Sequence, residues 1–111
     1  QFALPGVQAS GRGDSIGTMS FNGQGVALDA IARGTATATA GENLNWTGWS
    51  TMDQVLRILA TGRANEIRTA DTPIRIWDRT NIADAGDPPR PTVGYGEEYR
   101  DGYLELWGLG G

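Results

Sequence analysis

Tryptophan and arginine are the residues of this chain whose types and spacing best suit binding chemistry. Trp77 lies between Arg75 and Arg79, and Trp46 and Trp49 stand in a polar segment. Flat indole faces beside hydrogen-bonding neighbours suit the stacking of sugar rings, and Trp and Arg are also enriched at protein interfaces. The same residues would equally cover the rim of a small core. The candidate binding or interface residues are Trp46, Trp49, Arg75, Trp77, Arg79 and Trp107.

Carboxylates are the remaining groups that could support acid–base catalysis. The chain has no Cys, His or Lys, which excludes Ser-His-Asp and Cys-His catalysis, His-ligated or thiolate metal sites and Schiff-base chemistry. A glycosidase needs two carboxylates around one bond, for which Asp71 with Asp78, or Glu97 with Glu98 and Asp101, are available. A solvated acidic surface explains these residues more simply. We predict no catalytic residue, no cofactor and no metal site.

The composition indicates one small acidic domain with a modest core. Of the 111 residues, 39% are hydrophobic and 17 are Gly, so reinforcement by partner subunits is expected. The net charge of −4 and the pI of about 4.6 oppose binding to a phosphate backbone. No apolar run approaches the roughly 20 residues of a membrane span. The start at Gln1 lacks an initiator Met and a signal-peptide pattern, so processing or truncation upstream is expected.

The first part of the chain predicts an arm followed by strands. Residues 1–15 are rich in Gly and poor in large apolar side chains, which predicts an extended N-terminal arm. Apolar residues alternate around Met19 and Phe21 and again over Val26–Ala30, and the turn signal Asn22-Gly23 lies between them. This pattern predicts a β-hairpin. The alternating Thr and Ala of residues 35–40 predict a further strand with a thin inner face.

The middle of the chain predicts one helix. Residues 41–48 are interpreted as a polar turn, and apolar residues at helical spacing follow it. Ser50 suits an N-cap, and Gly62 supplies a C-terminal stop. We therefore predict a helix over about 51–61.

Strands and loops are predicted for the rest of the chain. Two strands are expected over 64–69 and 73–80, an extended Pro-rich loop over 84–91, and a last strand over 103–107. In the strand at 73–80, alternation predicts that Ile74 and Ile76 face the core. Arg75, Trp77 and Arg79 would then face outward.

Together these patterns predict a mainly β fold with one short α-helix at about 51–61. The expected architecture is a small β-sandwich or a fibre-like module, which would form an intertwined trimer. The expected domain organisation is an arm at 1–15 and a single β-rich domain at 16–111.

Two stretches resemble the small β-rich modules of tailed-bacteriophage fibres and spikes. They are residues 62–81, GRANEIRTADTPIRIWDRTN, and residues 103–108, YLELWG. The resemblance implies a homotrimeric structural and attachment protein of the virion that acts by assembly and binding. Its arm would dock to another virion protein, and its loops would face a receptor, with a host-surface saccharide as a possible ligand. A capsid-bound head fibre or decoration protein fits the same resemblance.

Two other classes of protein remain open at this stage. One is a carbohydrate-binding module, in which the tryptophans stack on sugar rings. The other is a small glycosidase that uses two of the carboxylates. Particle-associated copy number, titration with glycans and release of reducing sugar would separate the three classes.

Overall fold

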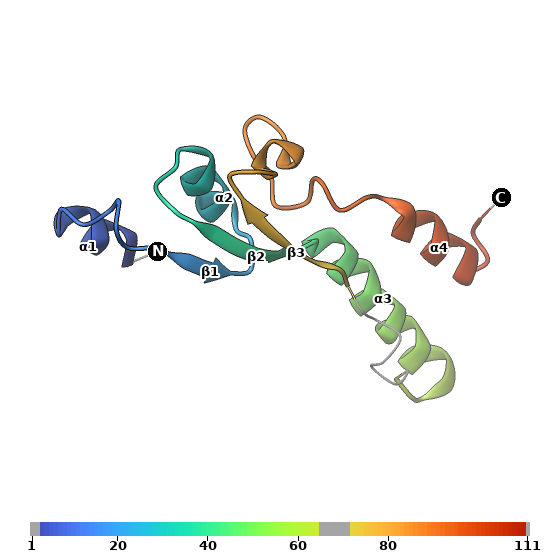
Figure 1. The fold of residues 1–111 in the computed structure, drawn as a ribbon. Helices are drawn as coiled ribbons and strands as arrows, with labels where there is room; N and C mark the ends of the chain where they lie inside the picture. The colour runs from blue at the N-terminus through green and yellow to red at the C-terminus, as the bar shows by residue number, and fades with distance from the viewer. Residues whose placement is uncertain (1–2, 65–71, 111) are drawn as a thin grey trace.

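The computed structural model describes residues 3–64 and 72–110, and helix outweighs strand in it (Figure 1). Helices make up 46% of the structure and a three-stranded sheet makes up 13%. The prediction of a mainly β fold is therefore wrong. In chain order the elements are α1 (Ala3–Ala9), β1 (Met19–Phe21), α2 (Gly25–Ala32), β2 (Ala38–Glu42), α3 (Leu44–Thr61), β3 (Ile74–Asp78), the 3-10 helix η2 (Ile82–Ala85) and α4 (Glu98–Leu106).

The sheet has the strand order β1-β2-β3 and combines a parallel pair with an antiparallel pair. β1 runs parallel to β2, with Phe21 opposite Ala40, and β3 runs antiparallel, with Ile76 opposite the same Ala40. Parallel strands need a crossover connection, which α2 provides. The predicted hairpin is therefore wrong in its second half, because Val26–Ala30 lies within α2.

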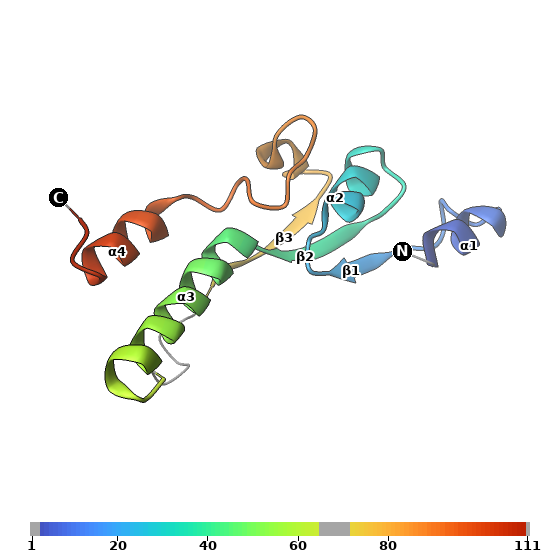
Figure 2. The ribbon, with the colours of Figure 1, turned by 180° about the vertical axis from the view of Figure 1, so that it is seen from behind.

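The core lies between α2 and one face of the sheet, as the two opposite views show (Figures 1 and 2). Its centre is formed by Leu28 and Ile31 of α2, Trp77 of β3 and Ala85 of η2, all with 0% exposure. The predicted orientation of β3 is thus reversed. Alternation along the strand was correct, but α2 covers the face that carries the large indole, and Ile74 and Ile76 lie on the other face.

The main helix begins earlier than the sequence pattern predicts. α3 starts at Leu44, inside the predicted polar turn, because the Asn43 side chain accepts hydrogen bonds from the backbone N–H groups of Asn45 and Trp46. Asn43, and not Ser50, is the N-cap. The end is as predicted, since Gly62 adopts the left-handed C-cap conformation with φ 73°.

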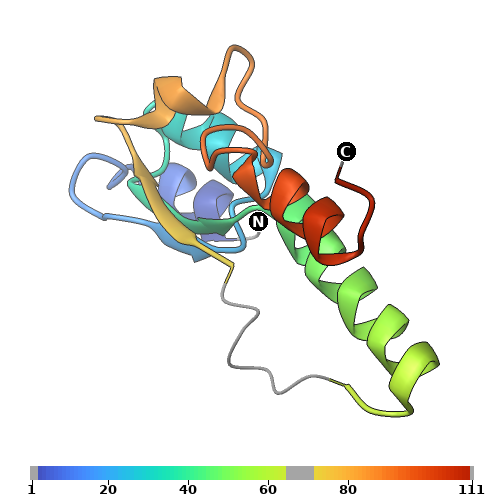
Figure 3. The same cartoon turned by 90° about the vertical axis from the view of Figure 1, so that its right-hand side faces the viewer.

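The predicted last strand is instead the second half of α4. Aromatic residues recur every four positions, at Tyr99, Tyr103 and Trp107, which places them on one helical face against α3. Acidic residues in the first turn of α4 also favour a helix through the helix dipole. Figure 3 shows α4 beside the first half of α3, the half nearest the sheet.

The structure also corrects two predictions, one for the N-terminal arm and one for the Pro-rich loop. The predicted extended arm contains the short helix α1, and η2 covers the start of the predicted Pro-rich loop. The strand predicted over 64–69 lies almost wholly outside the described residues.

Truncation of the apolar side chains on α3 is expected to have little effect on folding. Leu56 is 40% exposed and Leu59 is 78% exposed, although helical spacing suggests a buried stripe. We expect Leu56→Ala and Leu59→Ala each to change the free energy of unfolding by about 0.5 kcal/mol or less. Urea denaturation followed by circular dichroism measures this, and a loss of about 2 kcal/mol or more would show that the helix is covered in solution.

Candidate ligand-binding site

Polar residues gather where the two parallel strands end. β1 is followed by Asn22, Gly23 and Gln24, and β2 ends at Glu42 and is followed by Asn43. Because β1 and β2 are parallel, their carboxyl ends lie at the same edge of the sheet. Ligands of open α/β sheets bind outside this edge. We therefore define these side chains, together with Tyr95 described below, as the strand-end site.

The backbone of the strand-end site is unusually tight. Asn22 has φ 83° and is the only non-glycine residue with positive φ in the described ranges. Gly23 follows with φ 54°, and a Cβ placed on it would lie 2.6 Å from Cα of Gly41. The two strand ends therefore approach through bare backbone. Backbone in sparsely populated regions is often found at functional sites.

The Asn43 side chain brings an unused donor to the site. Its Oδ1 atom caps α3 through bonds of 3.0 Å to Asn45 N and 3.3 Å to Trp46 N. Asn43 is only 1% exposed, and its Nδ2 atom makes no hydrogen bond within the described structure. A buried amide N–H without an acceptor costs free energy. Because the atom is buried, a ligand oxygen can bond to it only where binding opens the strand ends.

Tyr95 closes the inner side of the site. Its hydroxyl oxygen accepts a hydrogen bond of 2.8 Å from Trp77 Nε1, and a Cβ placed on Gly41 would lie 2.4 Å from that oxygen. Burial raises the pKa of Tyr95, while the Trp77 hydrogen bond and the charge of Arg75 lower it and Glu42 raises it further. The phenol is therefore neutral at physiological pH, and its proton can be donated to a ligand.

Helix α2 begins at the same edge without a side-chain cap. Gln24 precedes its first residue and makes no capping hydrogen bond through its side chain. The first N–H groups of a helix lack partners within the helix. The Ala27 N–H already donates to the Gln24 carbonyl at 2.8 Å, so only the N–H groups before it can add to the donors of the site.

Arg75 and Trp77 hold the loop after β3 against the sheet. The Arg75 guanidinium stacks on the Trp77 ring at 4.2 Å from its centroid. It also donates hydrogen bonds to the carbonyl of Gly94 and to the carboxylate of Asp84. The outward aromatic face predicted for β3 is therefore absent, because Trp77 lies in the core.

The other predicted tryptophans, Trp46, Trp49 and Trp107, pack between α3 and α4. Trp49 stacks on Trp107 with ring centroids 5.3 Å apart and an interplanar angle of 5°, and Trp46 stacks on Tyr99 at 4.9 Å. These rings cover one another and form the contact between the helices. We call this group of stacked rings the aromatic seam. It consists of Trp46, Trp49, Tyr99, Tyr103 and Trp107.

A buried carboxylate on α3 forms a hydrogen bond with a tryptophan of the aromatic seam. Asp53 is 6% exposed and accepts hydrogen bonds from Trp107 Nε1 at 3.1 Å and from Arg57 Nε at 2.7 Å.

The remaining predicted site residue, Arg79, is exposed and is not part of the aromatic seam. Its guanidinium lies beside Gly34, where a Cβ would be 3.0 Å from Nη2.

Of the carboxylates considered for catalysis, Asp78 and Glu97 have structural partners, and Glu98 and Asp101 lie in the first turn of α4. Asp78 accepts hydrogen bonds from the hydroxyl and the backbone N–H of Thr80, and these lower its pKa, as does the backbone N–H of Asn81. A general acid needs a raised pKa. Glu97 lies 3.6 Å from Arg100, and Asp71 lies outside the described residues.

The described residues form neither a metal-binding cluster nor a helix that could span a membrane. No cluster of three or more acidic, His or Cys side chains is placed to hold a metal ion. In the same ranges, no helix combines the length and apolarity needed to cross a membrane. No family model, curated protein or solved structure matches the chain.

Sequence reasoning missed the strand-end site because it interpreted Asn22-Gly23 as a hairpin turn. The same dipeptide here ends a parallel strand before a helix. One signal could have found it. Leu28 and Ile31 follow with helical spacing, so a strand, a polar turn and a helix succeed one another, and Glu42-Asn43 before α3 repeats that order.

Proposed function

We propose that this chain is a non-catalytic binding module whose ligand is a small, neutral polyhydroxyl molecule such as a saccharide. The ligand would bind at the strand-end site. The observation that carries the proposal is the buried Nδ2 atom of Asn43, a donor without an acceptor, at the strand ends where Glu42 supplies a carboxylate. Donor and acceptor groups are then present at one edge of the sheet, which suits hydroxyl groups because each of them both donates and accepts.

The charges around the site support a neutral ligand. The chain has a net charge of −4, and Glu42 adds a negative charge within the site. Arg75 is the cation whose charge acts on Tyr95, and its guanidinium is already bound to Asp84. A phosphate or carboxylate ligand would therefore meet no free cation among these groups.

The other functional hypotheses remain predictions. The hypothesis of a trimeric attachment protein on the virion rested in part on a predicted β-rich fold. The observed fold is helix-rich and does not support that hypothesis. The carbohydrate-binding alternative agrees with the proposal in its ligand, but the proposed contacts differ. They are amide, carboxylate and phenol groups, whereas that alternative used exposed indole faces.

Removal of the Glu42 charge is expected to weaken saccharide binding by about tenfold or more, since a charged acceptor contributes about 1.5–3 kcal/mol. Isothermal titration calorimetry with a panel of mono- and disaccharides measures this in Glu42→Gln. Glu105→Gln, at an exposed position on α4, serves as the matched control and should bind like the unmodified chain.

Three results would contradict the proposal. One is the absence of binding to every saccharide in the panel. Another is binding that Trp46→Ala removes while Glu42→Gln leaves it unchanged, which would place the ligand on the aromatic seam. The third is release of reducing sugar from an offered polysaccharide, which would make the chain a glycosidase.

A further inference from the structure

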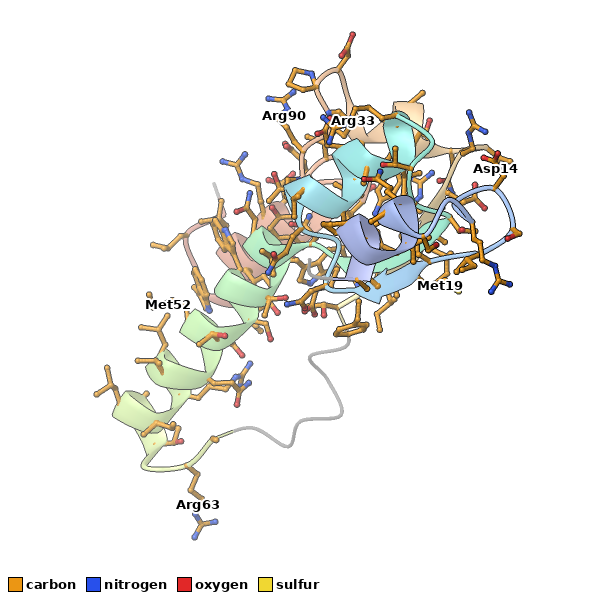
Figure 4. The ribbon with its side chains drawn as sticks, turned by 90° about the vertical axis from the view of Figure 1, so that its left-hand side faces the viewer. Asp14, Met19, Arg33, Met52, Arg63 and Arg90 are labelled. Atoms are coloured by element: carbon orange, nitrogen blue, oxygen red, sulfur yellow. The ribbon has the colours of Figure 1, made fainter. Side chains whose placement is uncertain are left out.

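A groove lies at the outer edge of β1, between that strand and the helices α1 and α2. Its volume is about 500 Å³, within the range of about 300–1,000 Å³ that is typical of small-molecule sites. In the view of Figure 4, α1 lies between Met19 on β1 and Arg33 at the end of α2. We call this cavity the edge groove. Most of its lining residues are apolar, among them Leu4, Pro5, Met19, Phe21, Val26 and Ala27.

One end of the edge groove belongs to the strand-end site. Asn22 and Gln24, which follow β1, line the groove as well as the site. Phe21, the last residue of β1, lines it beside Asn22. The Gln24 side chain makes no capping hydrogen bond, so its amide can bond to a ligand. A ligand bound at the strand ends therefore has a largely apolar cavity next to it.

The edge groove continues from the strand-end site along α2. Val26, Ala27 and Ala30 line it from this helix, as does Arg33, which follows the last helical residue. The rise from Val26 to Arg33 is about 10 Å along a helix. This length leaves room for a second, apolar group attached to the sugar.

The charges in the edge groove favour a neutral apolar group. Among the lining residues that the structure describes, Arg33 is the only charged one. Its Nη2 atom lies 2.6 Å from Asp29 Oδ2, and its side chain is 64% exposed. An ion pair at so exposed a position contributes little free energy. A carboxylate at the end of an apolar tail would therefore gain little from Arg33.

We propose that the edge groove holds the apolar aglycone, the group attached to the sugar, of a glycoside whose sugar occupies the strand-end site. The ligand class is then an alkyl or aryl glycoside. Phe21 lies where the sugar and the aglycone would meet, beside Asn22 and in the wall of the groove. The inference rests on the proposed saccharide function, because one ligand would occupy both the strand-end site and the edge groove.

Paired glycosides that differ only in the aglycone test the inference. The probes are methyl and hexyl β-D-glycosides of glucose, galactose and mannose, titrated into the full chain by isothermal titration calorimetry at concentrations below those at which micelles form. We expect a hexyl glycoside to bind about tenfold or more tightly than the methyl glycoside of the same sugar, because the longer chain is removed from water. Hexanoate and 1-hexanol, which lack the sugar, should each bind about tenfold or more weakly than the hexyl glycoside.

Val26→Asp is expected to lower the ratio of hexyl to methyl affinity to about one, because it places a charge in the groove. Val26 is 49% exposed and lies in the first turn of α2, where an acidic residue suits the helix dipole, so the variant should fold. Val26→Leu keeps the wall apolar and should keep the ratio. Val55→Asp, at a residue of α3 that is 44% exposed, is the matched control and should leave the ratio unchanged. Circular dichroism checks the folding of each variant.

Two outcomes would overturn the inference while the proposed function stands. One is equal binding of methyl and hexyl glycosides, and the other is a preference for the hexyl glycoside that Val26→Asp retains. Hexanoate binding as tightly as the hexyl glycosides would also overturn it, because the groove would then select a carboxylate amphiphile. So would a dimer that Val26→Asp converts to a monomer in sedimentation velocity, because a second copy would then fill the groove.

Failure of the proposed function gives a different result. In that case no methyl glycoside and no free sugar binds, and the inference fails with the function. Binding of the methyl glycosides therefore shows which of the two proposals a negative result concerns.

Discussion

Trp77→Ala is expected to lower the free energy of unfolding by about 3–5 kcal/mol, the largest effect of any single change considered for this chain. Trp77 is fully buried and contacts α2, η2 and Tyr95. Its removal would leave a cavity at the centre of the core, and the Tyr95 hydroxyl and the Arg75 guanidinium would lose the ring against which they lie. Denaturation in urea measures the loss.

A conservative change at the same position separates packing from hydrogen bonding. Trp77→Phe keeps an aromatic ring and removes the indole N–H that bonds to Tyr95. We expect a smaller loss of about 1–2 kcal/mol. If Trp77→Ala were as stable as the unmodified chain, the ring would not lie in the core, and the outward orientation predicted from the sequence would be restored.

Gly23→Ala is expected to be the next most damaging change, at about 2–5 kcal/mol. A side chain at φ 54° costs about 1–2 kcal/mol, and the added Cβ would lie 2.6 Å from Cα of Gly41. The clashing atom belongs to the backbone, which cannot move away as a flexible side chain can. The ends of β1 and β2 would therefore separate, which lowers the free energy of unfolding by a further amount of about 1–3 kcal/mol. Saccharide binding should weaken with it.

Gly11→Ala is the matched control for the close approach. Gly11 also has positive φ, at 68°, but a Cβ placed on it meets nothing within 4 Å. We expect a loss of about 1–2 kcal/mol from the backbone conformation alone. Equal losses in the two variants would mean that the strand ends do not touch through Gly23 and Gly41, and the strand-end site would lose its geometric basis.

The strand-end site and the aromatic seam differ in what they can offer a ligand. In the seam, Trp46 and Trp49 stack on the aromatic residues of α4, and the Asp53 carboxylate is occupied by Arg57 and Trp107. At the strand ends, the Asn43 amide is buried with an unused donor. Unused hydrogen-bonding capacity, and not aromatic content, therefore distinguishes the site that we propose for binding.

Only part of the strand-end site was accessible from the sequence. Asn22-Gly23 could be identified as a place where the chain turns, because these residues tolerate positive φ. Glu42 and Asn43 lie about twenty residues further along, and no local pattern links the two segments. They meet because β1 and β2 pair in parallel, which follows from the packing of α2 across them.

The sequence by itself determined the features that depend on composition and on short-range signals. The absence of Cys, His and Lys excluded whole classes of catalysis. Local alternation located β1 and β3, and Gly62 located the end of α3, because a left-handed C-cap requires glycine. These inferences needed no knowledge of what each segment contacts.

The tertiary structure alone decided which segments became helices and which sides of the strands were buried. Val26–Ala30 alternates like a strand but lies in α2, and Tyr103–Trp107 alternates like a strand but pairs with α3 through its rings. Alternation on β3 was equally compatible with either face inward, and the contact of Trp77 with Leu28 and Ile31 selected one. The physical reason is that short segments with weak local preferences adopt the structure that buries the most apolar surface against distant neighbours.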